Sequence, residues 1–175
     1  MKSLFKVLLR GIPSIFLLML VSAGWSEDLT DRQKLDRINE MYKDYKKSFP
    51  DTPDVSVEEL IVMKENSNIV IVDRRKKKEQ DVSMLPGAIT AKEFEKNIER
   101  YRDKTIVVYC TIGSRSGHYA KRLQKKGISA FNLKGSILSW IHAGQRIVDK
   151  DGETRRVHVY GPEWNLVPDG YEAVW

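Results

Sequence analysis

Residues 105–115 have the sequence Thr-Ile-Val-Val-Tyr-Cys-Thr-Ile-Gly-Ser-Arg. The β-branched run that ends at Tyr109 is typical of a strand buried on both faces of a parallel sheet. Cys110 follows this strand directly, and residues 116–126 have the apolar spacing of a helix. The segment therefore predicts a strand, a short loop and a helix in direct succession, with the single cysteine of the chain in the loop.

The sequence on either side of this segment repeats the same alternation. Further strands are predicted at 69–72 and 128–133, and further helices after Ser56, after Thr90 and at 136–143. Strands that alternate with helices over about 90 residues indicate βαβ units and a parallel sheet. We therefore expect an α/β fold with helices on both faces of the sheet.

The loop from Cys110 to Arg115 occupies a favourable place for chemistry in such a fold. In an open α/β sheet, ligands bind outside the carboxyl ends of the strands. The following helix supplies free N–H groups and a positive dipole end, and Arg115 adds a full charge. These surroundings lower the pKa of a thiol, so Cys110 is predicted to be a reactive thiolate in an anion-binding loop. The alternative is an inert cysteine buried at the end of a strand.

Four segments of the chain, taken in order, match a known pattern. They are Ile71-Val72-Asp73-Arg74-Arg75 with Glu79, Leu85-Pro86-Gly87-Ala88-Ile89, the loop from Cys110 to Arg115, and Leu133-Lys134-Gly135-Ser136 with Trp140 and Gly144. Together they resemble the motifs of single-domain rhodaneses, a family of thiosulfate-type sulfurtransferases, over residues 54–147. The resemblance implies a rhodanese-like three-layer fold, with a parallel β-sheet between two layers of helices.

The resemblance also implies a reaction. Cys110 would attack the sulfane sulfur of a small anionic donor such as thiosulfate, become a persulfide, and pass the sulfur to a thiol or to cyanide. Asp73 and Arg75 would support the loop from a neighbouring strand. No cofactor and no metal is implied, and no protein partner is assigned. The residues that would bind the substrate are Thr111, Ile112, Gly113, Ser114 and Arg115.

Three departures from the family pattern bear on the donor and the acceptor. Thr111 stands where the family often has an arginine, Ser83-Met84 replaces a Gly-His pair, and Ser136 replaces the second glycine of a Gly-Gly pair. A catalytically silent rhodanese-like binding module is therefore one alternative, although such modules often lack the cysteine. A phosphatase or arsenate reductase is another, but their loops resemble Cys-x5-Arg. The loop of this chain is Cys-x4-Arg, a size suited to sulfur rather than to a phosphoryl group.

Residues 1–23 have the composition of a secretory signal peptide. Lys2, Lys6 and Arg10 precede an apolar run at 12–21, and small residues follow the run. We expect export to a bacterial periplasm. The alternative is an uncleaved membrane anchor, but the run is shorter than the ~20 residues that span a bilayer.

The predicted signal peptide also accounts for half of the basic excess. Without it, the formal net charge of +6 falls to +3, from 27 basic and 24 acidic residues. No interleaved basic and aromatic motif accompanies the remaining charge. We therefore predict no nucleic-acid partner.

Two further segments flank the predicted domain of residues 54–147. Residues 24–53 are expected to form an amphipathic helix at 31–47, which packs on the domain, followed by a linker. Residues 148–175 are expected to form an ordered tail, because they are rich in aromatic residues. The chain is thus predicted to be one domain with an extension at each end.

The tail is expected to begin with a β-hairpin. The turn Asp149-Lys150-Asp151-Gly152 would connect a strand at 146–148 to a strand at 156–160. Trp164 and Trp175 are expected to pack on the edge of the sheet, and an aromatic ligand surface is the alternative.

Two groups of polar residues are expected to face solvent. His118 lies two helical turns beyond Cys110, so a solvent-facing position is favoured over a role in proton transfer. The basic run at 74–78 is expected to be a solvated face, with attraction of anionic donors as the alternative.

Overall fold

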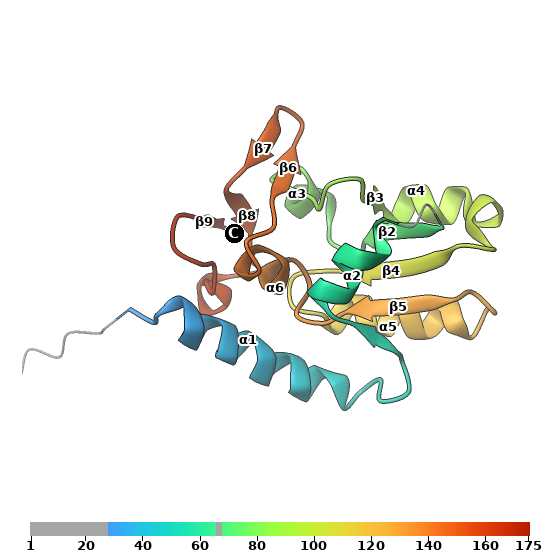
Figure 1. Cartoon of the computed structure of the whole chain (residues 1–175), viewed down its shortest axis with the longest axis horizontal. Coiled ribbons are helices and arrows are strands. Elements are labelled where there is room, and N and C mark those ends of the chain that lie inside the picture. Colours follow the sequence, from blue (N-terminus) through green and yellow to red (C-terminus); the bar gives the residue numbers. More distant parts are fainter. Residues whose placement is uncertain (1–27, 66–67) are drawn as a thin grey trace, which may run out of the picture.

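The computed structural model of the chain describes residues 28–65 and 68–175. Within these residues, five parallel strands form one sheet in the order β1-β5-β4-β2-β3 (Figure 1). The predicted signal peptide, residues 1–23, lies outside the described residues. The strands of the sheet are β1 (Asp54–Val55), β2 (Ile69–Asp73), β3 (Ile89–Thr90), β4 (Thr105–Tyr109) and β5 (Ala130–Leu133). The helices are α1 (Asp31–Lys46), α2 (Val57–Met63), α3 (Lys77–Gln80), α4 (Ala91–Lys96), α5 (Ser114–Gln124) and α6 (Ser136–His142), with 3-10 turns η1 (Ile98–Tyr101) and η2 (Pro162–Trp164).

Strand β4 is the centre of the sheet and is apolar on both sides. It pairs with β2 along one edge and with β5 along the other. Because successive side chains of a strand point to opposite faces, Ile106 and Val108 belong to one core cluster. Val107 and Tyr109 belong to the other. All four side chains are fully buried, as expected for a central parallel strand.

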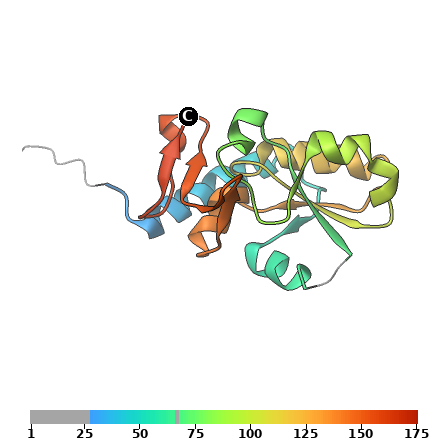
Figure 2. The same ribbon diagram turned by 90° about the horizontal axis from the view of Figure 1, so that it is seen from above.

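Helices cover both faces of this sheet. Helices α4 and α5 pack on the face of Val108, with Phe94 and Leu123 among their inward residues. Helices α2 and α6 pack on the face of Val107, through residues such as Leu60. Figure 2 shows α2 on one side of the sheet and α4 and α5 on the other. The predicted α/β fold, a parallel sheet between layers of helices, is confirmed.

Helix α1 is amphipathic, as predicted, and packs against α5 and α6. A capping box fixes its start: Thr30 Oγ1 accepts from Gln33 N at 3.3 Å, and Gln33 Oε1 accepts from Thr30 N at 2.8 Å. Ile38 and Tyr42 in its apolar stripe are buried. The Tyr42 hydroxyl donates to the carboxylate of Asp54 and thereby ties α1 to β1.

The C-terminal tail differs from the prediction in its strand pairing. Its strands are β6 (Ile147–Asp149), β7 (Gly152–Thr154), β8 (Arg156–His158) and β9 (Glu172–Val174). Strand β6 pairs antiparallel with β7, whereas β8 pairs in parallel with β9, so the predicted pairing of 146–148 with 156–160 is wrong. The turn is tighter than expected, because Asp149 Oδ1 accepts from the amides of Asp151 at 2.8 Å and Gly152 at 3.1 Å.

The tail packs on the end of the domain. Val157, Val159 and Leu166 belong to the core cluster that contains α6. His142 Nε2 of α6 lies 2.8 Å from the carbonyl oxygen of Leu166. In Figure 1 the tail, in orange and red, lies next to α6. This position brings the tail close to the loop that follows β4.

Within residues 28–65 and 68–175, no helix has both the length and the hydropathy needed to cross a membrane.

Candidate active site

The loop after β4 has the geometry that the sequence predicts. Tyr109 ends β4, Cys110 follows, and α5 begins at Ser114, two residues before its predicted start. Gly113 has a φ of 128°, which lets the chain turn directly from loop into helix. The result is a pocket of about 240 Å³ at the carboxyl end of the strand. Five of the predicted site residues line it, namely Cys110, Thr111, Ile112, Ser114 and Arg115.

The Cys110 sulfur occupies the base of this pocket as a buried hydrogen-bond acceptor. Gly113 N donates to Sγ at 3.2 Å, and Ser116 Oγ donates to it at 3.4 Å. The N-cap residue of α5 is Gly113, which has no side chain to accept a hydrogen bond from the first turn. The sulfur therefore takes the place of a capping side chain at the positive end of the helix.

The same contacts favour the thiolate. Burial raises the pKa of the Cys110 thiol, because it disfavours the charged form. The positive charge of Arg115 and the hydrogen bonds from Ser116 and Gly113 act in the opposite direction and prevail. The pKa of Cys110 therefore lies below its ordinary value, so a larger fraction of the sulfur is ionised at neutral pH than in an unperturbed cysteine.

Arg115 is held by the carboxylate of Glu79, a residue that was not among the predicted site residues. Its Nη1 and Nη2 donate to the two carboxylate oxygens of Glu79, each at 2.7 Å. Nη2 also donates to Thr111 Oγ1 at 2.9 Å. Although Glu79 is buried, which raises its pKa, the Arg115 guanidinium lowers that pKa to about 2. The signal for this contact was the position of Glu79 in the first matched motif.

A second ion pair lies behind the loop, where the sequence places Asp73 and Arg75. Arg75 Nη2 donates to Asp73 Oδ2 at 2.8 Å, and both side chains are 0% exposed. The Tyr109 hydroxyl donates to the same Asp73 oxygen at 2.6 Å. Arg75 also donates to the carbonyl of Ser83. The pair joins β2, β4 and the segment before β3, and it does not line the pocket.

The prediction for the basic run at 74–78 is wrong for one of its members. Arg75 is buried in this ion pair, because Asp73 lies two residues before it at the end of β2. Lys76, Lys77 and Lys78 are exposed, as expected.

Ser136 supplies a hydroxyl beside the sulfur from the start of α6. Among the described residues it is the one non-glycine residue with a positive φ, 52°. Its Oγ accepts from Cys110 N at 3.0 Å and lies 4.0 Å from Cys110 Sγ. A left-handed backbone costs a residue with a side chain about 1–2 kcal/mol. The hydrogen bond to the Cys110 amide offsets part of this cost and explains why serine is accommodated at a glycine position of the motif.

Comparison with known proteins assigns a family to this geometry. Residues 56–143, half of the chain, match the Rhodanese-like domain family. The chain belongs to the rhodanese-like family.

Similar proteins carry sulfurtransferase names. The chain is 38% identical over 68 residues to a tRNA sulfurtransferase of Desulfurococcus amylolyticus, a match that covers 39% of this chain but 14% of that protein. It is 29% identical over 92 residues to a sulfurtransferase of Allochromatium vinosum, covering 50% of this chain and 86% of that protein. The thiosulfate sulfurtransferase structure from Pseudomonas aeruginosa has the same fold, with a TM-score of 0.53 and 21% identity over 73% of this chain and 25% of that one.

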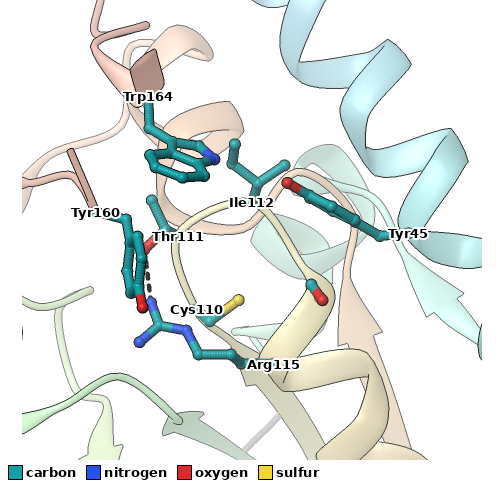
Figure 3. Close-up of a pocket in the computed structure, with 8 residues that line it drawn as sticks. Tyr45, Cys110, Thr111, Ile112, Arg115, Tyr160 and Trp164 are labelled. Atoms are coloured by element: carbon teal, nitrogen blue, oxygen red, sulfur yellow. Dashed lines mark hydrogen bonds between the residues drawn. The ribbon is translucent and has the colours of Figure 1, made fainter. Parts of the chain in front are cut away.

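Three aromatic residues outside the rhodanese-like domain complete the pocket. Tyr45 comes from α1, and Tyr160 and Trp164 come from the tail. Figure 3 shows these rings around the mouth of the pocket, with the Cys110 sulfur between them and Arg115. Tyr160 and Trp164 pack edge to face with their ring centres 5.1 Å apart, and the Arg115 guanidinium lies 5.8 Å from the Tyr160 ring.

This arrangement corrects the expectation for the two tryptophans of the tail. Trp164 packs on the core cluster, as expected, but it also lines the pocket. Trp175 is 59% exposed, so the prediction that it packs on the sheet edge is wrong. Trp175 comes directly after β9, and its ring faces away from the core clusters.

The remaining polar candidates lie away from the sulfur. His118 is exposed on α5, as predicted, with Nε2 3.2 Å from Ser48 Oγ and its ring against Phe49. Within residues 28–65 and 68–175, no group of His, Cys, Asp and Glu is arranged to hold a metal ion. The described site thus consists of a thiolate, loop amides, two serine hydroxyls and a charge-compensated arginine.

Proposed function

We propose that this chain is a rhodanese-type sulfurtransferase that carries sulfane sulfur as a persulfide on Cys110. The observation that carries the proposal is the buried sulfur at the N-terminus of α5, with a lowered pKa and an open pocket in front of it. The donors we propose are thiosulfate or a persulfide, and the acceptor is a thiol or, in an assay, cyanide.

The reaction needs only the chemistry of the thiolate. Cys110 attacks the outer sulfur of the donor, a new S–S bond forms, and the bond between that sulfur and the rest of the donor breaks. With thiosulfate, sulfite leaves with the bonding electron pair. The Cys110 persulfide anion then gives its outer sulfur to cyanide as thiocyanate, or to a thiolate as a new persulfide, and the Cys110 thiolate returns.

The loop is suited to hold the persulfide. A persulfide anion carries its charge one atom farther into the pocket than the thiolate. The N-terminus of α5, where Gly113 N already donates to the Cys110 sulfur at 3.2 Å, favours an anion at this end of the helix. Arg115, held in place by Glu79, lines the side of the pocket and is the largest of the contacts that lower the pKa of Cys110.

Two alternative functions are less well supported by these residues. The loop has four residues between Cys110 and Arg115, one fewer than the phosphatase-like loops that it resembles. A silent binding module has no need for a thiol with a lowered pKa, or for the hydroxyls of Ser116 and Ser136 that surround it. We therefore favour sulfur transfer.

Mass spectrometry of the purified protein tests the proposal. After treatment with thiosulfate or an organic thiosulfonate, we expect a mass increase of one sulfur atom on the peptide that contains Cys110, and its removal by cyanide. The Cys110→Ser variant, treated in the same way, is the control and should gain no sulfur. A wild-type protein that gains no sulfur from any donor would shift the assignment to the binding module.

We also propose that residues 1–23 direct export to a periplasm. A reporter that is active only after export, fused behind residues 1–24, should gain activity. The same reporter fused to the chain without these residues is the control, and its export would contradict the proposal.

A further inference from the structure

The pocket of Cys110 offers little uncompensated positive charge to a donor. Among its described lining residues, Arg115 is the one charged side chain. Both terminal nitrogens of its guanidinium donate to Glu79, and the lowered pKa of Glu79, about 2, keeps that carboxylate ionised at neutral pH. The side-chain charges of the pair cancel. A dianion such as thiosulfate therefore finds amides and a helix dipole here, but no side-chain cation without a carboxylate partner.

One wall of the pocket is apolar and aromatic. The wall consists of Tyr45, Tyr160 and Trp164, with Ile112 of the loop beside them (Figure 3). Tyr160 lies next to Arg115, whose guanidinium is 5.8 Å from its ring. The pocket has a volume of about 240 Å³. This space exceeds what a single sulfur atom needs, and aromatic rings contribute most when a flat apolar group packs against them.

The wall is assembled before any donor binds, because the two extensions are joined to each other. Lys34 of α1 forms an ion pair with Asp169 of the tail at 2.8 Å. The amide of Asp169 donates to Asp31 Oδ1 at 2.9 Å. Tyr45 and Trp164 also pack against the core cluster, which positions their rings at the pocket.

We propose that Tyr45, Tyr160 and Trp164 bind the organic group of the sulfur donor and make this chain selective for donors with an apolar, preferably aromatic, group. The inference rests on the proposed function and names its substrate class: organic thiosulfonates and persulfides in preference to thiosulfate. The residues that select the donor lie outside the rhodanese-like domain of residues 56–143, whereas Cys110 lies within it.

Sulfur transfer from such a donor forms one S–S bond and breaks another. With benzenethiosulfonate, the Cys110 thiolate attacks the terminal sulfur, and the S–S bond to the sulfonyl sulfur breaks. Benzenesulfinate leaves with the electron pair, and the Cys110 persulfide anion remains. No oxidant, reductant or cofactor enters the step.

Two donors that differ only in their organic group test the proposal. Benzenethiosulfonate and methanethiosulfonate carry the same charge and the same transferable sulfur. We measure the second-order rate constant for sulfur loading of Cys110 by quenched-flow mass spectrometry with each donor, and with thiosulfate. Each constant is divided by the constant for free cysteine with the same donor, which removes the difference in leaving group.

We expect the normalised constant to be at least about tenfold higher for the phenyl donor than for the methyl donor, equal to about 1.4 kcal/mol. Trp164→Ala should abolish most of this preference. Tyr160→Ala should reduce it as well, and because Tyr160 is 57% exposed, this variant keeps the test valid if the loss of Trp164 unfolds the tail. Trp175→Ala is the matched control, since it removes an exposed tryptophan of the same tail, and it should keep the preference.

Equal normalised constants for the two thiosulfonates in the wild type would overturn this inference and leave the proposed function intact. A preference that survives both Trp164→Ala and Tyr160→Ala would also overturn it. If none of the three donors loads Cys110, the proposed function fails, and the inference fails with it.

Discussion

The pocket has a floor and a wall that differ in origin and in chemistry. The floor is the Cys110 loop with the first turn of α5, and it lies within the rhodanese-like domain of residues 56–143. The wall is Tyr45, Tyr160 and Trp164, and it comes from the two extensions. The floor is polar and lowers the pKa of the sulfur, whereas the wall is aromatic and is proposed to contact the organic group of the donor. We infer that one loop can keep its reaction while flanking segments change its substrate.

The largest effect is expected from a change in the buried ion pair behind the Cys110 loop. Arg75→Met leaves the Asp73 carboxylate buried without its ion partner, although Tyr109 still donates to it. Loss of one partner from a buried pair destabilises a protein by about 3–5 kcal/mol. We expect a fall of this size in the free energy of unfolding, measured by urea denaturation.

The control for this change is Arg102→Met. Arg102 forms an ion pair with Glu99 at 2.8 Å, but these side chains are 52% and 73% exposed. The urea midpoint of this variant should equal that of the wild type, because solvent screens exposed pairs. Equal losses for Arg75→Met and Arg102→Met would show that the buried pair does not stabilise the floor.

The next largest effect is expected from Gly113→Ala, which changes the contact between the Cys110 loop and α1. An added Cβ would lie 2.5 Å from Cε2 of Tyr42, and the φ of 128° disfavours any side chain. The backbone strain costs about 1–2 kcal/mol and overpacking about 1–3 kcal/mol more. We expect a lower melting temperature together with slower loading of Cys110 by every donor.

Gly144→Ala separates the two causes. Gly144 also has a positive φ, 70°, but no atom lies within 4 Å of its added Cβ. This variant should show the backbone cost alone and load Cys110 at the wild-type rate. A melting temperature for Gly113→Ala as high as that of Gly144→Ala would mean that Tyr42 does not constrain the loop.

The smallest effect is expected from Ser116→Ala, which changes the pKa of Cys110 without moving the loop. The hydrogen bond from Ser116 is one of the contacts that lower the pKa of Cys110, so its loss should raise that pKa. The pH midpoint of Cys110 alkylation by iodoacetamide should therefore lie higher in the variant than in the wild type. Ser83→Ala is the control, because Ser83 is equally buried and its Oγ has no hydrogen-bond partner among the described residues.

The lowered pKa of Cys110 also predicts how stability depends on pH. Between the folded-state pKa and the higher, ordinary pKa, the unfolded chain binds more protons than the folded one. The contribution of Cys110 to stability is therefore present above the ordinary pKa and is lost as the pH falls through the folded-state value. Cys110→Ser should lack this dependence when urea midpoints are compared across the same pH range.

The floor could be predicted from the sequence because it is contiguous. Cys110 and Arg115 are separated by four residues, and the strand and helix around them have clear apolar periods. The matched motifs also placed Asp73 and Arg75 at the neighbouring strand end. What the motifs did not reveal is that Glu79 binds Arg115, since two side chains 36 positions apart meet only through the sheet register.

The sequence offered Trp164 as part of an aromatic ligand surface only as an alternative, and it did not place the wall beside Cys110, because nothing local marks that contact. Tyr45 has the spacing of a core residue in an amphipathic helix, and Trp164 lies in a 3-10 turn more than a hundred positions away. The two meet only because α1 and the tail pack at the same end of the domain. The hairpin error in the tail has a similar origin, since the side chain of Asp149 tightens a turn whose length the pattern alone left open.

The separate roles of floor and wall are tested by one ratio, the loading constant for benzenethiosulfonate divided by that for methanethiosulfonate. This ratio is measured in Ser116→Ala and in Trp164→Ala. We expect Ser116→Ala to lower both constants by the same factor and to keep the ratio, because the sulfur nucleophile is common to both donors. We expect Trp164→Ala to lower the ratio. A ratio that changes in Ser116→Ala but stays constant in Trp164→Ala would contradict the account.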